Sequence, residues 1–442
     1  MPKRVIIIGS GFSGLASAVR LADAGFEVLV LESRAHLGGR AYSFKDSTTG
    51  DTVDNGQHLF MGCYRETIAF LDKIGCLDRL HFQKTPRVDF VDIAGQSSTF
   101  ECPSLPAPFH ALVGLFKMSG ISVSDKLRTL NVGLAIRGGK NGSGDRLTVS
   151  DWLDGLGQSQ RIKERFWYPM MIAALNEDPK IASARMLKAV LQEAFGAGLA
   201  STRIGISKVG LSDLYTTGAQ TFLEARGGAV QTNAQVVELE ASEFQVRSVK
   251  LRTGELLEAD FFVSAVPPAS LDRFLPEAAR EGKLARIGDL ATSPIVSINL
   301  WFDRPVLERE FIGLLGTRTQ WAFDKNLIFG TGSRPSHVAL VLSAAREYAG
   351  WPREQLVEMA VGEFRQIVPA SREAKLVHST VVKERDATLS HTVESDYLRP
   401  GPGTSFSNFI LAGDWTDTGL PATIESAVVS GHTAADLVIR HP

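Results

Sequence analysis

The chain has few of the features that mark secreted, metal-binding or membrane-spanning proteins. It contains only 3 cysteines in 442 residues, Cys63, Cys76 and Cys102. These are too few for a disulfide framework, and their spacing matches no zinc site. No window of about 18 residues is continuously apolar, so no transmembrane helix is expected. The formal net charge of −2 gives no reason to expect nucleic acid as a partner. The sequence therefore predicts a cytoplasmic protein with reduced thiols and no metal.

What the chain does have is a dinucleotide-binding pattern in its first 32 residues. The apolar run Val5–Ile8 is typical of a strand that is buried on both faces of a parallel sheet. It leads into a Gly-x-Gly-x-x-Gly motif, then a helical pattern, and then a second apolar strand that ends at Glu32. This strand–turn–helix–strand context makes the motif far more specific than three glycines alone. The motif consists of Gly9, Ser10, Gly11, Phe12, Ser13 and Gly14.

Each part of the pattern has a physical role at a dinucleotide. Gly9 makes the tight turn, Gly11 lets the backbone approach the pyrophosphate, and Gly14 brings the helix against the strand. The start of the helix offers unpaired N–H groups to the phosphates. Glu32 can accept hydrogen bonds from the adenosine ribose, and its charge would repel a 2′-phosphate, which disfavours NADP. FAD and NAD remain as candidates, against the alternative of a merely structural glycine-rich turn.

Segments near both ends of the chain resemble the flavin amine oxidase and phytoene desaturase superfamily. After Glu32 and Ser33, the sequence Leu37–Arg40 is similar to the superfamily's amino-terminal FAD site. The resemblance implies that Gly38 and Gly39 let the chain pass close to the pyrophosphate and that Arg40 helps to hold it. It also implies that Gly56, Gln57 and His58 lie at the flavin, and that Val236 meets the adenine through its backbone.

The closing segment of the chain carries the same resemblance. A predicted strand, 409–412, reaches Gly413 and Asp414, and 420–427 opens a final helix with Pro421 near its first turn. The resemblance places Asp414 at the ribityl chain and the backbone of Thr423 and Ile424 at the pyrimidine edge of the flavin. This segment contains no cysteine, so we expect FAD to be bound without a covalent thioether link.

The distribution of these FAD-site segments along the chain predicts an α/β fold. Two domains are expected, since 442 residues are too many for one ordinary domain. We expect a Rossmann-like FAD-binding domain, of the GR2 type, interleaved with an α+β substrate domain. The FAD-binding domain would be built from residues 1–80, 206–270 and 401–442. The substrate domain would be built from two insertions, residues 81–205 and 271–400.

Three further segments together resemble the hydroxysqualene dehydroxylases, a bacterial branch of the superfamily. This resemblance implies reductive removal of a hydroxyl from hydroxysqualene to give squalene, for hopanoid biosynthesis, with a long-chain isoprenoid substrate and an unidentified electron donor for FAD. The segments are Asp54–Tyr64, Phe166–Pro169 with Leu175 and Asn176, and Gly413–Glu425.

Other functions stay open at this point. A phytoene-type desaturase uses the same cofactor in the opposite direction. A flavin amine oxidase is disfavoured, because our alignment places Ser297 where such enzymes carry a lysine near flavin N5. A non-catalytic prenyl-lipid-binding protein of the same fold is disfavoured by the intact nucleotide motifs. A dehydroxylase needs an acid to protonate the departing hydroxyl, and we favour His58 for this role over Tyr168 and Asp324. A structural histidine is at least as plausible.

The segment 105–121 is apolar and almost uncharged, and it precedes a basic stretch. An apolar helix beside basic residues can lie in a membrane interface. A core helix next to a solvated charged neighbour explains the same pattern and is the favoured interpretation. Peripheral membrane contact is therefore a secondary prediction. The basic residues are Lys126, Arg128, Arg137, Lys140 and Arg146.

Overall fold

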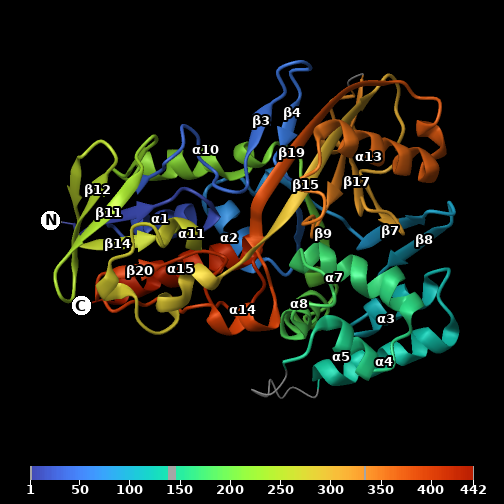
Figure 1. The fold of residues 1–442 in the computed structure, drawn as a ribbon, viewed down its shortest axis with the longest axis horizontal. Helices are drawn as coiled ribbons and strands as arrows, with labels where there is room; N and C mark the ends of the chain where they lie inside the picture. Colours follow the sequence, from blue (N-terminus) through green and yellow to red (C-terminus); the bar gives the residue numbers. More distant parts are fainter. Residues whose placement is uncertain (1, 138–145, 333–334, 442) are drawn as a thin grey trace.

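The computed structural model describes residues 2–137, 146–332 and 335–441. In Figure 1 both marked ends of the chain lie on one side of the molecule, beside a parallel sheet. A second sheet and a cluster of helices occupy the other side. Lys140, one of the predicted basic residues, lies outside the described ranges.

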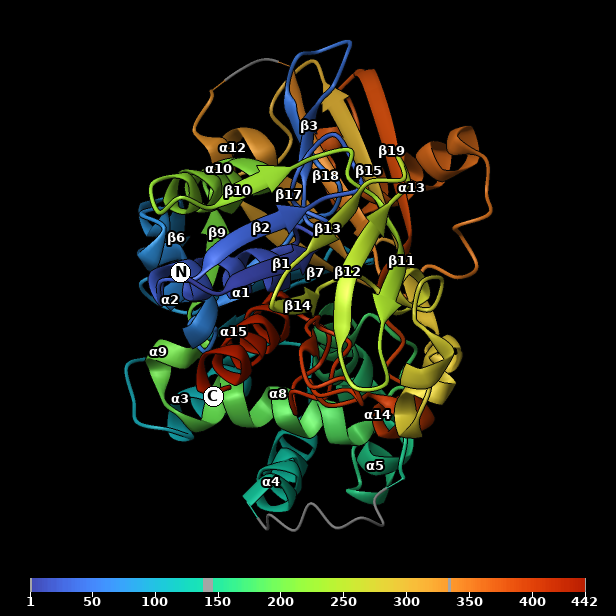
Figure 2. The ribbon, with the colours of Figure 1, turned by 90° about the vertical axis from the view of Figure 1, so that its left-hand side faces the viewer.

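The parallel sheet, here called the nucleotide sheet, has the strand order β10-β2-β1-β14-β20. Every neighbouring pair is parallel. The order brings three chain segments that are far apart in the sequence side by side. Figure 2 shows β10, β2, β1 and β14 of this sheet. The strands are β10 (Ala229–Gln231), β2 (Glu27–Leu31), β1 (Arg4–Ile8), β14 (Phe261–Ser264) and β20 (Phe409–Leu411).

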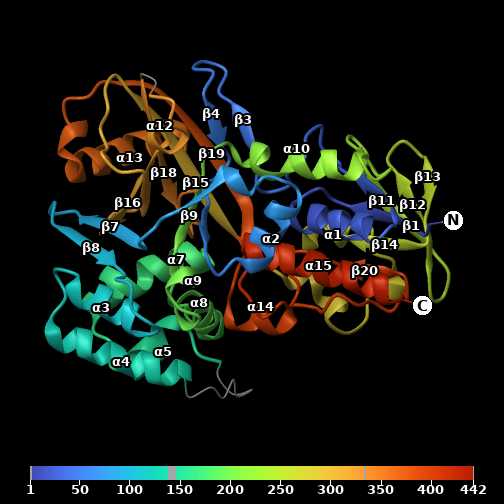
Figure 3. The same cartoon turned by 180° about the vertical axis from the view of Figure 1, so that it is seen from behind.

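Both faces of the nucleotide sheet are covered, which explains its continuous apolar strands. Val5 and Ile7 of β1 pack with helices on one face, and Ile6 and Ile8 pack with a three-stranded antiparallel sheet on the other. Figure 3 shows the helical face. The helices are α1 (Phe12–Asp23), α10 (Leu211–Glu224) and α15 (Ile424–Arg440), with α2 (Arg65–Lys73) packed against α15. The antiparallel strands are β11 (Val236–Ala241), β12 (Val246–Leu251) and β13 (Leu256–Glu258).

The final helix begins later than the sequence predicts. Thr423 is its N-cap, and its side chain accepts a hydrogen bond from the Ser426 backbone N–H. Pro421 therefore lies outside the helix rather than in its first turn, because a threonine that can cap the helix follows it.

The second sheet, here called the substrate sheet, has seven strands in the order β19-β15-β18-β17-β16-β7-β8. Helix α13 (Arg353–Ile367) covers one face through Leu356, Ala360 and Phe364. Strands β7 and β8 come from the first predicted insertion and the other five from the second. The strands are β19 (Leu376–Leu389), β15 (Thr292–Phe302), β18 (Ser336–Leu342), β17 (Trp321–Asp324), β16 (Phe311–Leu315), β7 (Arg87–Asp92) and β8 (Ser97–Glu101).

A cluster of helices packs against the other face of the substrate sheet (Figure 1). Phe166 and Trp167 lie in the core of this cluster. The elements are α3 (Phe109–Lys117), α4 (Val123–Arg137), α5 (Val149–Gly155), α6 (Gln160–Ile162), the π-helical turn η2 (Lys163–Trp167), α7 (Tyr168–Leu175), α8 (Ala184–Gly196) and α9 (Leu199–Thr202).

Two small sheets join the two large regions. The hairpin of β3 (Ser43–Lys45) and β4 (Thr52–Asp54) reaches the substrate sheet, where the Trp301 indole donates to Asp51 Oδ2 at 2.7 Å. The sheet β5-β9-β6 pairs strands across the predicted boundaries at residues 80 and 205. Its strands are β5 (Leu59–Met61), β9 (Ile204–Ser207) and β6 (Leu80–Phe82). The remaining elements are α11 (Pro268–Leu271), α12 (Lys325–Phe329), α14 (Val393–Leu398), and the 3-10 turns η1 (Leu77–Arg79), η3 (Glu277–Ala279), η4 (Gly282–Asp289) and η5 (Pro369–Ser371).

Candidate active site

A cavity of about 660 Å³ lies between the nucleotide sheet and the substrate sheet. It gathers predicted site residues from segments that are up to about four hundred positions apart. Gly14 instead packs against the first turn of the motif. The predicted residues that line the cavity are Gly9, Ser10, Gly11, Phe12, Ser13, Glu32, Ser33, Gly38, Gly39, Arg40, Gly56, Gln57, His58, Val236, Gly413, Asp414, Thr423 and Ile424.

At the glycine motif, backbone segments approach one another too closely for side chains to fit between them. A Cβ on Gly14 would stand 1.9 Å from the Gly9 carbonyl oxygen, so only glycine lets α1 approach the turn this closely. Gly39 has a φ of +57°, and a Cβ on it would come within 3.1 Å of the Gly11 Cα. The backbones of Gly11 and Gly39 are therefore in close contact, with no side chain between them.

The buried carboxylate of Glu32 lies beside the glycine motif. Ser10 donates to Glu32 Oε2 through its backbone N–H at 3.1 Å and its hydroxyl at 2.5 Å. The Arg34 backbone N–H donates to Glu32 Oε1 at 2.9 Å. A carboxylate fixed by several donors keeps further lone pairs for a ligand hydroxyl. Glu32 thus has the geometry for binding a ribose.

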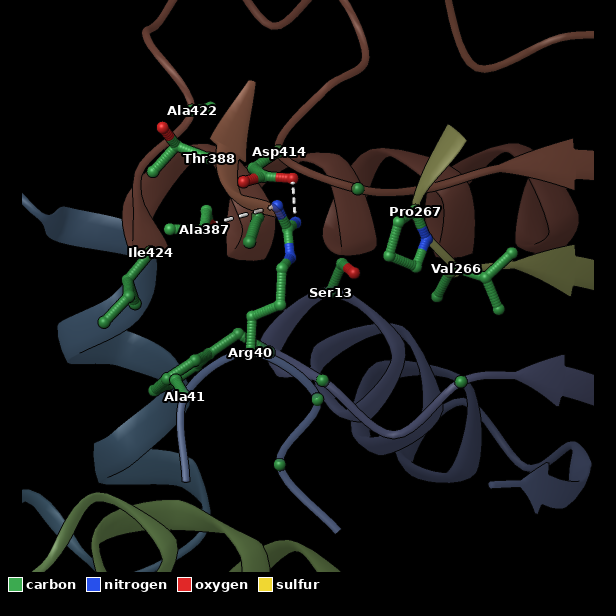
Figure 4. A pocket seen from close by; sticks show the side chains of 18 of the residues that line it. Ser13, Arg40, Ala41, Val266, Pro267, Ala387, Thr388, Asp414, Ala422 and Ile424 are labelled. Atoms are coloured by element: carbon green, nitrogen blue, oxygen red, sulfur yellow. Dashed lines mark hydrogen bonds and ion pairs between the residues drawn. The ribbon is translucent and has the colours of Figure 1, made fainter. Parts of the chain in front are cut away.

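Arg40 links the first and last segments of the nucleotide region. Its guanidinium bonds to Asp414 Oδ1 at 2.5 Å and to the Ala387 carbonyl oxygen at 3.3 Å. Figure 4 shows the side chain extended between these two partners. Arg40 is therefore placed by a carboxylate of the closing segment and by β19 of the substrate sheet.

The loop after β20 is held by two residues that the sequence analysis missed. Arg399 is fully buried and donates to the carbonyl oxygens of Asp414, Trp415, Thr416 and Leu420. His391 Nε2 accepts a hydrogen bond from the Ala422 backbone N–H at 2.6 Å. Both lie outside any recognisable motif, so only the folded structure identifies their role.

Two further residues hold the segment around Gly38: Tyr215, which the sequence analysis missed, and Asn55, which lies in the recognised segment Asp54–Tyr64. The Tyr215 hydroxyl donates to the carbonyl oxygens of Gly38 and Ala41 at 2.8 and 3.1 Å. The same ring stacks on Phe12, with ring centroids 3.7 Å apart. Asn55 donates to the Arg40 carbonyl oxygen at 3.0 Å. The nucleotide end of the cavity is thus fixed by hydrogen bonds from α10 and from the segment after β4.

The other end of the cavity is mostly apolar. Residues of three substrate-sheet strands line it, and Trp321 and Phe323 of β17 are two positions apart, the spacing of side chains on one face of a strand. Ala173 and Ala174 of α7 complete the wall opposite. The strand residues are Ile295, Trp321, Phe323 and Val341.

Two left-handed residues mark the edge of this apolar end. Asn176, with a φ of 50°, accepts a hydrogen bond from the backbone N–H of Ala344, whose φ is 51°. Asn176 also donates to the Ser293 carbonyl oxygen and the Thr388 hydroxyl. Left-handed non-glycine residues are strained and are held by their surroundings. The contact ties α7 to the turn after β18.

The candidate acids do not occupy equivalent places. His58 lines the cavity, and burial lowers its imidazolium pKa, so the ring is neutral near neutral pH. The Tyr168 hydroxyl instead lies 3.3 Å from Ser150 Oγ. Asp324 caps α12 by accepting a hydrogen bond from the Leu327 backbone N–H. Of the three, only His58 faces the space in which a substrate could bind.

These features fit a flavin dinucleotide. The glycine cradle, the buried carboxylate of Glu32 and the N-terminus of α15 lie along one cavity, and its far end is apolar. Within the described ranges, no group of three or more His, Cys, Asp or Glu residues is arranged to hold a metal ion. The same ranges contain no helix long and apolar enough to cross a bilayer.

Comparison with known families agrees with this geometry. The profile of the flavin containing amine oxidoreductase family matches residues 12–439. The chain belongs to this family and is a flavin-dependent oxidoreductase with an α/β fold.

Individual relatives are similar over nearly the whole chain. Hydroxysqualene dehydroxylase of Rhodopseudomonas palustris is 31% identical over 443 residues, covering 99% of both chains. A probable zeta-carotene desaturase of Synechococcus elongatus is 27% identical and covers 99% of this chain and 98% of its own. An oxidoreductase structure from Methanosarcina mazei has a TM-score of 0.77 at 17% identity, covering 98% of this chain and all of the other.

Proposed function

We propose that this flavoenzyme removes the hydroxyl group of hydroxysqualene reductively and releases squalene and water. The main support is the similarity along the full chain to a hydroxysqualene dehydroxylase. The apolar end of the cavity suits a hydrocarbon chain. Ser297, rather than a lysine, stands at the aligned position of the substrate sheet, which counts against amine oxidation.

We further propose that the flavin is FAD and that it is bound without a covalent bond. Glu32 would hold the adenosine ribose, and the glycine cradle with Arg40 would hold the pyrophosphate. Asp414 would meet the ribityl chain, and the start of α15 would lie at the pyrimidine edge, where its dipole stabilises negative charge. No cysteine stands in the closing segment 409–424. Denaturation should therefore release intact FAD, whereas flavin that stays on the unfolded chain would contradict this assignment.

When bound, reduced FAD would supply a hydride to the carbon that loses the hydroxyl, after reduction by an electron donor still to be identified. The chain's own task is to hold that carbon, exclude water and deliver a proton to the departing oxygen. We assign the proton to His58. Because burial lowers its pKa, the imidazolium form grows as pH falls. The rate should therefore rise toward acid pH, and His58→Gln should remove this rise.

The alternative function is a carotenoid-type desaturase, favoured by the similarity to the Synechococcus elongatus protein. The two functions run in opposite redox directions, so one experiment separates them. Chemically reduced enzyme is incubated with hydroxysqualene without oxygen, and oxidised enzyme with phytoene. Squalene, identified by mass, supports the dehydroxylase. New conjugated double bonds in phytoene, with hydroxysqualene left intact, would overturn it.

We also propose that the protein works in the cytoplasm at a membrane surface. In the predicted segment, Phe109 and Phe116 are exposed, whereas Leu115 and Met118 are buried. Helix α4, which begins after that segment, also carries exposed apolar residues. On α4 the exposed apolar residues recur at helical spacing, at Val123, Leu127, Leu130 and Leu134.

The charges around this surface suit an anionic membrane. Between residues 109 and 136, the exposed charged side chains are Lys117 and Arg128. Asp125, the one acidic residue of that range, is buried. An apolar helix face with basic neighbours binds anionic lipid surfaces. The cationic surface also disfavours pairing with a second copy of the chain.

Flotation with liposomes tests this proposal. Vesicles containing phosphatidylglycerol should carry the protein upward, and phosphatidylcholine vesicles should carry less. Replacing Leu127, Leu130 and Leu134 together by serine should abolish flotation. The control, Leu437→Ser on the exposed side of α15, should not change it. Equal flotation of both variants would contradict the assignment.

A further inference from the structure

A buried cation joins the substrate sheet to the segment that carries Gln57 and His58. Lys325 follows β17 and is 2% exposed at its side chain. Its ammonium lies 2.7 Å from Asp54 Oδ2 and 2.5 Å from Gln57 Oε1. It also lies over the Phe329 ring, 4.2 Å from the centroid. All three ammonium protons therefore have partners, and none is left for a ligand.

This arrangement fixes which way the Gln57 amide points. An ammonium group has donors only, so Gln57 must present its oxygen to Lys325. Its Nε2 group then points the other way and makes one long contact, 3.4 Å, with the His58 carbonyl oxygen. Gln57 lines the cavity. The amide therefore offers a hydrogen-bond donor to whatever binds there.

The donor stands where the nucleotide end meets the apolar end of the cavity. A Cβ on the preceding Gly56 would lie 3.9 Å from Ser297 Oγ of the substrate sheet. On the other side, Trp321 and Phe323 of β17 line the apolar end just before Lys325. A substrate that extends along the apolar end would bring its reacting end to this junction. In such surroundings an unmatched donor is costly, so a ligand with an oxygen at this point is favoured over one without.

We propose that Gln57, oriented by Lys325, donates a hydrogen bond to the hydroxyl oxygen of the substrate. Lys325 is a positioning residue, and Gln57 determines specificity by distinguishing an alcohol from the corresponding hydrocarbon. The inference rests on the proposed function, since it assumes an isoprenoid alcohol as substrate. It assigns to Gln57 a role beyond cofactor contact, because recognition of the substrate oxygen would favour binding of the alcohol and release of the product.

The test compares the affinities of hydroxysqualene and squalene for the oxidised, flavin-loaded protein. Gln57→Met keeps the length of the side chain and removes the donor. Gln57→Glu keeps an oxygen for Lys325 and also removes the donor. Unmodified protein should prefer hydroxysqualene, and both variants should lose about 3- to 10-fold of that preference, the usual range for one neutral hydrogen bond. Their affinity for squalene should stay the same.

A second pair of variants tests the role of Lys325. Lys325→Met alone would leave the Asp54 carboxylate buried and unpaired, which destabilises the fold. The double variant Asp54→Asn with Lys325→Met removes both charges and frees the Gln57 amide. This double variant should lose the preference for the alcohol as Gln57→Met does. The single variant Lys325→Arg keeps a cation beside Gln57 and should keep part of that preference.

The outcomes separate this inference from the proposed function. If unmodified enzyme reduces hydroxysqualene and Gln57→Met keeps the full preference for the alcohol, the role of Gln57 is wrong and the function stands. A shift of the flavin absorption spectrum in Gln57→Met, with unchanged preference, would place the donor on the flavin and would also overturn the inference. If unmodified enzyme neither binds nor reduces hydroxysqualene, both proposals fail.

Discussion

The two ends of the cavity are built from different materials. The nucleotide end consists of backbone, glycines and a few charged groups, each held by several hydrogen bonds, as at Glu32. The apolar end consists of side chains from three strands and α7. A substitution alters the shape of a backbone surface only when the new side chain blocks a close approach between backbone segments. In a wall made of side chains, every substitution alters the shape. We therefore expect the nucleotide end to determine whether a cofactor binds, and the apolar end to determine which substrate binds.

The largest effect is expected where α15 packs on α1. A Cβ on Gly431 would stand 2.2 Å from the Ser13 carbonyl oxygen, so Gly431→Ala forces the two helices apart. We expect a loss of about 3 kcal/mol of stability and of bound flavin. Gly362→Ala, in α13 with open space around it, should instead stabilise by about 0.5–1 kcal/mol. Thermal unfolding and flavin absorbance measure the stability and flavin content of both variants. Equal changes in Gly431→Ala and Gly362→Ala would contradict this prediction.

The second effect concerns the ribose carboxylate. Glu32→Ala removes a buried acceptor that already binds Ser10 and Arg34, and hydrogen bonds to charged groups contribute about 1.5–3 kcal/mol. We expect FAD to bind about 10- to 100-fold more weakly in titrations of flavin-free protein. Glu27→Gln, at an exposed carboxylate paired with Arg4, should leave the affinity unchanged. Full affinity in Glu32→Ala would show that the nucleotide end works through its backbone alone.

Acid should weaken the substrate sheet selectively. His337 of β18 stacks on Trp301 of β15, and burial lowers the pKa of His337 to about 3. The folded protein keeps this ring neutral, while the unfolded chain takes up a proton below about pH 6.5. The contribution of His337 to the free energy of unfolding is therefore complete above pH 6.5. It falls as the pH drops toward 3, and about 2 kcal/mol of it is lost at pH 5.

Urea unfolding at pH 7.5 and pH 5 measures this effect against His337→Gln, which cannot titrate. The stability gap between the two proteins should narrow by about 2 kcal/mol at pH 5. The other buried histidines remain in both proteins, so their contributions cancel. No strand of the nucleotide sheet contains a histidine. An unchanged gap would show that His337 does not titrate with unfolding.

The smallest effect is expected at the apolar wall. Ala174→Phe narrows the substrate end without touching the nucleotide end. We expect the KM for hydroxysqualene to rise about tenfold, the order seen when a pocket mismatches by a methylene or two, with flavin content unchanged. Ala278→Phe, at an exposed position of η3, serves as the control. Unchanged KM in Ala174→Phe would place the substrate chain elsewhere.

The same contrast explains how much the sequence could predict. The nucleotide end depends on local spacing, so Gly9–Gly14, Glu32 and Gly413–Asp414 could be recognised along the chain, and all of them except Gly14 line one cavity. The N-cap at Thr423 depends on its neighbours, and the sequence placed the start of the final helix too early. Arg399, Tyr215 and Lys325 act only across distant contacts. Buried residues of this kind resemble any other core or surface position in a sequence, so no local pattern could have identified them.

The arrangement of β20 and α15 also has a consequence for biosynthesis. Asp414, Thr423 and Ile424 are among the last residues of the cavity lining to be translated. Domains start to fold while their earlier segments are being translated. The first strands and the substrate sheet can form during translation. Both the glycine cradle and the closing segment can contact the flavin only after translation has passed residue 424. Cofactor loading would then be a late event, and nascent chains stalled before residue 409 should carry no flavin.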